Sequence, residues 1–154
     1  MPWCRVPRIS SRHVVKQTSV DGCGAACGEM LLHDRGQQVD QSVLAMALAE
    51  PTDGPRLAGC LSDVSTIRWM GGVLARTRPP NWDFVAAICA DYSSWAALLE
   101  PGGPTEVGHW VVVDGVSADG LVLVRDPAVG PYGIPMEEFL DLWRYTVVVL
   151  PRST

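Results

Sequence analysis

The sequence lacks any apolar stretch that approaches the roughly eighteen residues of a membrane-spanning helix, so no transmembrane segment is expected. Residues 1–17 carry positive charges but no hydrophobic core of the signal-peptide type, so nothing there marks the chain for secretion. No cluster of basic residues stands out, and the formal net charge is −5, which argues against a nucleic-acid partner. These absences favour a protein that works in a cytoplasm.

Metal-ligand and disulfide patterns are also missing. The 5 cysteines are odd in number and irregularly spaced, and Cys23 and Cys27 are four residues apart, unlike the C-x-x-C pairs of zinc ribbons and redox sites. Each of the 3 histidines stands alone in the sequence, so spacing assembles no four-ligand set. The sequence therefore predicts reduced thiols, no metal and no organic cofactor.

What is present suits one globular domain. A chain of 154 residues with 47% hydrophobic content can bury a core, and it contains no internal repeat or low-complexity tract, so we expect a single domain over residues 1–154. Capping and periodicity predict helices at 22–35, 41–50, 61–70, 82–90 and 135–143. Strands are expected at 72–78, 95–100, 109–116, 121–126 and 145–151, with loops at 52–59 and 127–133. Helices followed by an antiparallel sheet indicate an α+β architecture with two lobes.

The segments 109–116 and 121–126 form a predicted β-hairpin. A four-residue loop over 116–119 would place Gly115 opposite Gly120 and His109 opposite Asp126. Directly opposed side chains have Cβ atoms roughly 4.5–5.5 Å apart, which is within hydrogen-bonding reach for an imidazole and a carboxylate. A carboxylate in that position selects the imidazole tautomer and stabilises the imidazolium.

Cys23 is the thiol that such a histidine would activate. It lies at the expected start of a helix, where the macrodipole and free N–H groups favour a thiolate. Gly22 and Gly24 are expected to leave room for a substrate backbone, and the Gln17 amide is a second candidate donor to an oxyanion. With His109 as base and Asp126 as its orienting partner, these residues make a complete acyl-transfer site.

The sequence resembles the C39 family of papain-like cysteine peptidases, the bacteriocin-processing domains and their relatives. The family pattern of a Gln, five residues and Cys-Gly-x-Ala-Cys appears here as Gln17 and 23–27, "CGAAC". Its second half appears as "HWVVV" from His109 and "DPAVG" from Asp126, and the resemblance spans residues 14–150. The chain departs from the family in having Gly22 between Asp21 and the cysteine, so the shape of that loop is expected to differ.

The resemblance implies a papain-like fold, with a helical N-terminal lobe, the nucleophile Cys23 at a helix N-terminus and a C-terminal antiparallel sheet. It further implies His109 as the base, Asp126 as the residue that orients it and Gln17 as the oxyanion-hole donor. The implied substrate is a peptide or protein cut after small residues such as a Gly-Gly leader pair.

Other interpretations remain open at this stage. A papain-like toxin or effector would cleave or deamidate a target protein, would be delivered into a target-cell cytoplasm and would have an immunity or inhibitor protein as partner. A non-catalytic peptide-binding module is a third possibility. For single residues, Cys23 and His109 are alternatively core residues, Asp126 a turn-former and Gln17 a surface residue. Cys27 is expected in the core.

Overall fold

The computed structural model describes residues 3–49, 51–74, 81–101 and 107–151. The helices in these ranges are α1 (Cys23–His33), α2 (Gln41–Ala47), α3 (Gly54–Ser65), α4 (Trp82–Tyr92) and α5 (Met136–Leu142). The strands are β1 (Val6–Pro7), β2 (Met70–Val73), β3 (Trp95–Leu99), β4 (His109–Val116), β5 (Leu121–Asp126), β6 (Gly130–Pro135) and β7 (Trp143–Val149).

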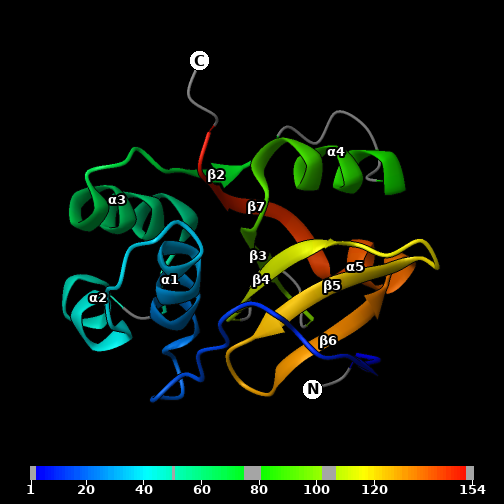
Figure 1. Cartoon of the computed structure of the whole chain (residues 1–154), viewed down its shortest axis with the longest axis horizontal. Helices are drawn as coiled ribbons and strands as arrows, with labels where there is room; N and C mark the ends of the chain where they lie inside the picture. Colours follow the sequence, from blue (N-terminus) through cyan, green and yellow to red (C-terminus); the bar gives the residue numbers. More distant parts are fainter. Residues whose placement is uncertain (1–2, 50, 75–80, 102–106, 152–154) are drawn as a thin grey trace.

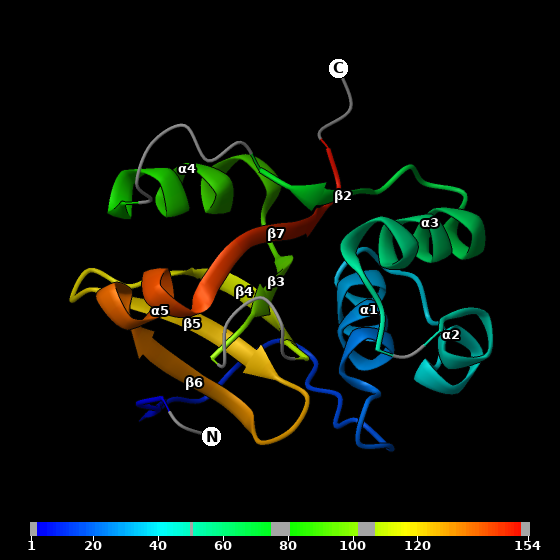
Figure 2. The same ribbon diagram turned by 180° about the vertical axis from the view of Figure 1, so that it is seen from behind.

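One antiparallel sheet organises the molecule. Its strand order is β1-β6-β5-β4-β3-β7-β2, so the short strands β1 and β2 form the two edges. Helices α1, α2 and α3 gather on one side of the sheet, and α4 and α5 lie on the other, as Figures 1 and 2 show from opposite sides. The expected α+β arrangement of a helical lobe and an antiparallel sheet is confirmed.

Two hydrophobic cores follow from the alternation of side chains along the central strands. Trp110 and Val112 of β4 pack with α1, α2 and α3. Val111 and Val113 point to the opposite face and pack with α4 and α5. Because helices cover both faces of the sheet here, residues 110–113 of β4 are all apolar and all buried. Trp110 and Trp143, each 1% exposed, are core residues.

Local sequence signals set most helix ends. The side chain of Asp40 accepts a hydrogen bond from the Ser42 N–H (2.8 Å), and that of Asn81 accepts one from the Phe84 N–H (3.0 Å), so the two helices begin at residues 41 and 82 as predicted. Helix α1 ends near Gly36, whose φ of +79° is the left-handed conformation that glycine tolerates.

The interpretation of Pro- and Gly-rich segments as loops was wrong in two places. Helix α3 begins at Gly54, inside the expected loop, because Asp53 caps it through the Arg56 N–H (2.8 Å) and proline is tolerated in a first turn. It ends at Ser65, before the expected end at residue 70. Residues 130–135, expected mostly as loop, form β6, which pairs with β5 along its length.

Other boundaries moved by a few residues. The last strand begins at Trp143, two residues earlier than expected, and ends at Val149. The strand expected at 72–78 corresponds to β2, which begins at Met70, and residues 75–80 lie outside the described ranges. In the described part of the chain, no helix combines the length and apolar character needed to cross a membrane.

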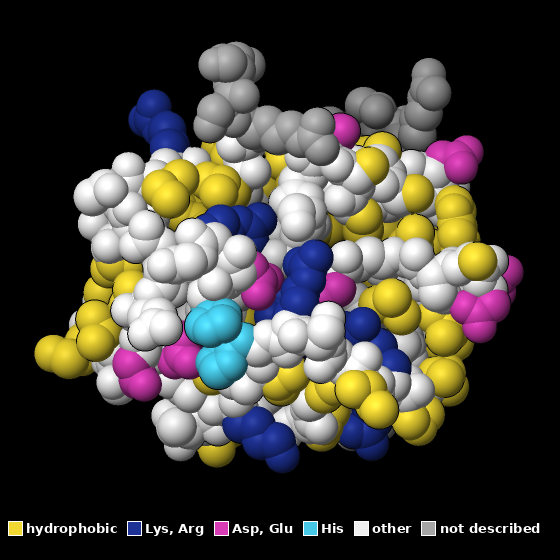
Figure 3. All heavy atoms as spheres, viewed as in Figure 1, with side chains coloured by type: hydrophobic (Ala, Val, Ile, Leu, Met, Phe, Trp, Pro, Cys, Tyr) yellow, Lys and Arg dark blue, Asp and Glu magenta, His cyan; other side chains and the backbone are white. Residues whose placement is uncertain are grey.

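A buried ion-pair network ties the helical lobe to the sheet. Arg125 of β5 is fully buried and donates to the carboxylates of Asp34, just after α1, and Asp114 of β4. It also donates to the carbonyl of His13 at 2.7 Å. Arg8 pairs with Asp114 at 2.6 Å. On the face shown in Figure 3, side chains of both charges gather in the middle, beside histidine side chains.

Candidate active site

Cys23 is the first residue of α1, as expected, and is 6% exposed. Gly22 caps the helix without a side-chain hydrogen bond, and the first turn contains no acidic residue. The first intrahelical bond runs from the Ala26 N–H to the Gly22 carbonyl (3.1 Å), so the Cys23 N–H has no acceptor within the helix. The thiol therefore lies in the positive field of a helix N-terminus, next to a free backbone donor.

His109 begins β4 and hydrogen-bonds Asp126, the last residue of β5, with 2.7 Å between Nε2 and Oδ1. The contact is as expected, but the predicted register was wrong. Val112 pairs with Arg125, so that Val111, and not His109, lies opposite Asp126, and a bulge follows between Val113 and Gly115. His109 reaches Asp126 as a diagonal neighbour on the same face of the sheet.

The Cys23 side chain also interacts with the histidine and favours its protonated form. Burial is the largest influence and on its own lowers the His109 pKa, but the bonds and charges of Asp126 and Cys23 outweigh it and raise this pKa from 6.5 to about 9. Because Nε2 is engaged by Asp126, Nδ1 is the ring nitrogen left to exchange a proton with the thiol. The imidazole is consequently protonated at neutral pH.

Asp126 is fully buried and its carboxylate has several donors. Its Oδ1 accepts from His109 and from the Ala128 N–H (2.7 Å), and its Oδ2 accepts from the Tyr132 hydroxyl. The bond to Ala128 is the local turn that an Asp-Pro sequence favours, so Asp126 forms a turn and contacts the histidine at once.

Gln17 lies on the segment before α1, and its backbone N–H donates to the Pro127 carbonyl (2.8 Å), next to Asp126. Its side-chain Nε2 donates to the carbonyls of Ser19 and Val20 at 2.9 and 3.0 Å, and its buried Oε1 has no partner. The structure thus brings Gln17 beside the His109–Asp126 pair but directs its amide N–H groups into the 19–20 loop.

The two glycines beside Cys23 do not open the site as expected. A Cβ on Gly24 would lie 2.5 Å from Thr52 Cγ2 and 3.6 Å from Trp110 Cδ1, and a Cβ on Gly22 would lie 2.6 Å from Ser19 Oγ. The space therefore belongs to neighbouring protein atoms and lets α1 pack closely against the sheet. Cys27, one turn further, is fully buried, and burial with the nearby charges of Cys23 and Asp126 raises its pKa.

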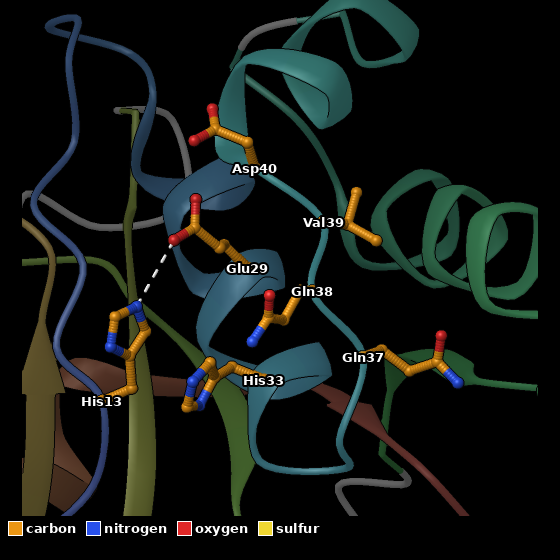
Figure 4. A pocket seen from close by; sticks show the side chains of 7 residues that line it. All are labelled: His13, Glu29, His33, Gln37, Gln38, Val39 and Asp40. Atoms are coloured by element: carbon orange, nitrogen blue, oxygen red, sulfur yellow. Dashed lines mark ion pairs between the residues drawn. The ribbon is translucent and has the colours of Figure 1, made fainter.

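A separate pocket of about 410 Å³ lies on the outer side of α1 (Figure 4). Its seven lining residues are His13, Glu29, His33, Gln37, Gln38, Val39 and Asp40. His13 and His33, which stand alone in the sequence, are exposed, but their rings stack at 4.1 Å and His13 pairs with Glu29 at 3.5 Å. Among the residues with described positions, no group of histidine, cysteine and acidic side chains is arranged to hold a metal ion.

Sequence reasoning missed three residues around the site. Gln41 accepts from the Thr18 N–H (3.3 Å) and donates to the Lys16 carbonyl (2.7 Å), which holds the backbone on both sides of Gln17. Tyr132 contacts Asp126, and Trp3 contacts Tyr132. No local pattern reveals these pairs, because they depend on strand pairing and on the packing of α2.

Comparisons with known proteins agree with this geometry. The sequence profile of the Peptidase C39 family matches residues 104–154, the segment that contains His109 and Asp126. In this segment the chain is similar to the C39 peptidases. "Cysteine protease effector 1" of Escherichia coli O1:K1:H7 is 33% identical over 150 residues, which are 97% of this chain and 29% of that protein. The C39-like chain thus spans less than a third of this relative's length.

Three solved structures share the fold. The peptidase domain of Streptococcus ComA, a bifunctional ABC transporter, has a TM-score of 0.72 and 15% identity over 91% of this chain and 98% of its own. A double-glycine-motif protease from an AMS/PCAT transporter, solved with the leader peptide, has a TM-score of 0.71 and 17% identity over 97% of this chain and 98% of its own. A C39-like peptidase from Bacillus anthracis has a TM-score of 0.73 and 15% identity over 97% of this chain and 99% of its own.

Proposed function

We propose that this C39-like domain hydrolyses a peptide bond through an acyl-enzyme on Cys23. The observation that carries the proposal is the hydrogen-bonded pair of His109 and Asp126 beside Cys23, the first residue of α1, whose side chain interacts with His109. A thiolate attacks the scissile carbonyl, and the imidazolium of His109 protonates the departing amine. His109 then takes a proton from the water that releases the acyl group.

The oxyanion of the tetrahedral intermediate requires donors beside the thiolate. The Cys23 N–H is available, because it has no acceptor within the helix. Gln17 is the second proposed donor, and its amide must turn away from the carbonyls of Ser19 and Val20 to serve. The unpartnered Oε1 of Gln17 supports such a rearrangement, since the resting position leaves a buried acceptor unsatisfied.

We propose a protein or peptide substrate with glycine at the cleaved position. The double-glycine-motif protease solved with its leader peptide supports this choice by its shared fold. The cysteine protease effector of Escherichia coli favours a related role, in which this domain acts as an effector on a protein in a target-cell cytoplasm. An immunity or inhibitor protein that blocks the site is then the expected partner.

N-terminal peptide mapping by mass spectrometry tests the proposal. Purified protein and a Cys23→Ala variant are each incubated with a bacterial lysate and with a synthetic peptide containing a Gly-Gly pair. New termini that require Cys23 and follow glycine are expected. Glutamines that gain about one mass unit in a Cys23-dependent way would indicate a deamidase instead. If neither new termini nor deamidation is observed, only the interpretation as a non-catalytic peptide-binding module remains.

The raised pKa of His109 sets the alkaline limit of activity. Because this pKa is about 9, the imidazolium that protonates the leaving amine is present at neutral pH and is lost as the pH rises through about 9. We expect kcat/KM to stay level from pH 7 to 8 and to fall above about pH 9, measured with a fluorogenic peptide. A fall centred near the ordinary histidine value of 6.5 would contradict this assignment.

A further inference from the structure

The hydroxyl of Tyr132 on β6 donates to Oδ2 of Asp126, the carboxylate oxygen that His109 does not use. Strand pairing places it there, because Tyr132 lies opposite Val124 and is therefore a diagonal neighbour of Asp126. Tyr132 is 3% exposed and Asp126 fully buried, so water does not replace this donor. His109 and Tyr132 thus approach the same carboxylate from the two strands beside β5.

Trp3 extends this series from the N-terminal segment. Its indole N–H donates to the Tyr132 hydroxyl at 2.9 Å, and its ring lies 6.3 Å from the ring of His109. The strand β1 brings it into place, since Val6 pairs with Gly133 and Pro7 with Tyr132. Trp3 is 5% exposed and packs over the polar contacts.

Each of these bonds restricts the next group in the series. Trp3 donates to the oxygen of Tyr132, so the Tyr132 proton is directed to Asp126. With Oδ2 held in this way, the carboxylate cannot rotate freely, and Oδ1 stays aligned with Nε2 of His109. A buried carboxylate oxygen without a donor is costly, so loss of the hydroxyl favours a turned Asp126 and a misaligned imidazole.

We propose that Tyr132 and Trp3 are positioning residues for the Asp126–His109 pair, and that residues 3–7 thereby form part of the catalytic apparatus. This inference rests on the proposed peptidase activity. Simple core packing would require only the aromatic rings, whereas positioning requires the O–H and N–H groups.

The test replaces the hydrogen-bonding groups and keeps the rings. Tyr132→Phe is expected to lower kcat about 10-fold with little change in KM, and Trp3→Phe to lower it about threefold. Tyr92→Phe, at the end of α4, is the matched control for loss of a tyrosine hydroxyl and should match the wild type. Thermal melting verifies that each variant folds.

The pH dependence of Cys23 alkylation by iodoacetamide provides a second readout that packing alone does not move. The titratable groups that face His109 are Cys23 of α1 and Asp126 of β5, while Tyr132 and Cys27 lie behind them. In Tyr132→Phe a turned Asp126 no longer holds the imidazolium of His109, so the pKa of His109 falls and the alkaline inflection of the alkylation profile should move to lower pH.

The outcomes separate the two proposals. If the wild type shows neither Cys23-dependent cleavage nor faster alkylation of Cys23 than of the other thiols, the proposed function fails. If the wild type shows both, yet Tyr132→Phe retains kcat within twofold and an unmoved alkaline limb, the positioning role is overturned. Should Tyr132→Phe fail to fold, Trp3→Phe decides by the same two measurements, because it leaves the tyrosine in place.

Discussion

Replacing Cys23 by serine or His109 by alanine is expected to lower kcat/KM on the order of 10³-fold or more, and the double replacement to lower it no further. The reason is that the two residues act as one unit, interacting with each other and held by Asp126. Without the imidazole the thiol is not activated and the leaving amine is not protonated. Without the thiol the imidazole has no nucleophile to activate.

Steady-state kinetics on the mapped cleavage site measure this double-mutant cycle. Cys89→Ser, at a partly exposed cysteine of α4 outside the series, is the matched control and should retain full activity. Cys23 is largely buried, so a thermal melt of each variant separates lost chemistry from lost folding. If the fold losses in kcat/KM of the two single variants multiply in the double variant, the residues act independently. That outcome contradicts the proposed mechanism.

Arg125→Met should reduce the free energy of unfolding by about 3–5 kcal/mol, the range found when one partner of a buried ion pair is removed. The guanidinium is fully buried and donates to two carboxylates and one carbonyl. Methionine has a similar length, so little cavity results. The loss arises because Asp34 and Asp114, with side chains only 10% and 9% exposed, keep their charges without their main partner.

Urea unfolding followed by circular dichroism measures this loss. Arg56→Met is the matched control, because Arg56 is exposed and makes one surface ion pair with Asp53 at 3.5 Å. Such a pair is worth at most about 1 kcal/mol. If Arg125→Met is as stable as the control, Arg8 and Arg12 suffice to neutralise the two aspartates, and Arg125 is not the central cation of the network.

Local chemistry was sufficient to predict the ends of elements that carry their own caps. Asp40 and Asn81 begin helices where expected, and Cys23 starts α1. The hairpin was also predictable, but its register was not, because the turn spans residues 117–121, with Val116 opposite Val122, and a bulge next to Asp114 then shifts the pairing by one residue. The contact between His109 and Asp126 was nevertheless predicted correctly, because diagonal neighbours on paired strands are still within reach of each other.

The remaining errors have a common cause. Proline and glycine were interpreted as signs of loops. Pro55, however, lies in the first turn of α3, and Gly133 of β6 pairs with Val6 of β1. The local cap at Asp53 decided the first case, and pairing with β5 decided the second. The contact of Arg125 with Asp34 joins residues 91 positions apart, and that of Trp3 with Tyr132 joins residues 129 positions apart, so no local window of sequence contains them.

The wide separation of the site residues along the chain also determines when the activity can appear. Cys23 belongs to the first helix, but His109 and Asp126 lie on strands from the second half of the chain, and Trp3 returns to β6 across an interval of 129 residues. A chain that is still being synthesised, or that is threaded unfolded through a narrow channel, contains the thiol without its base. On the proposed mechanism, the chain therefore has no peptidase activity until the whole sheet has assembled.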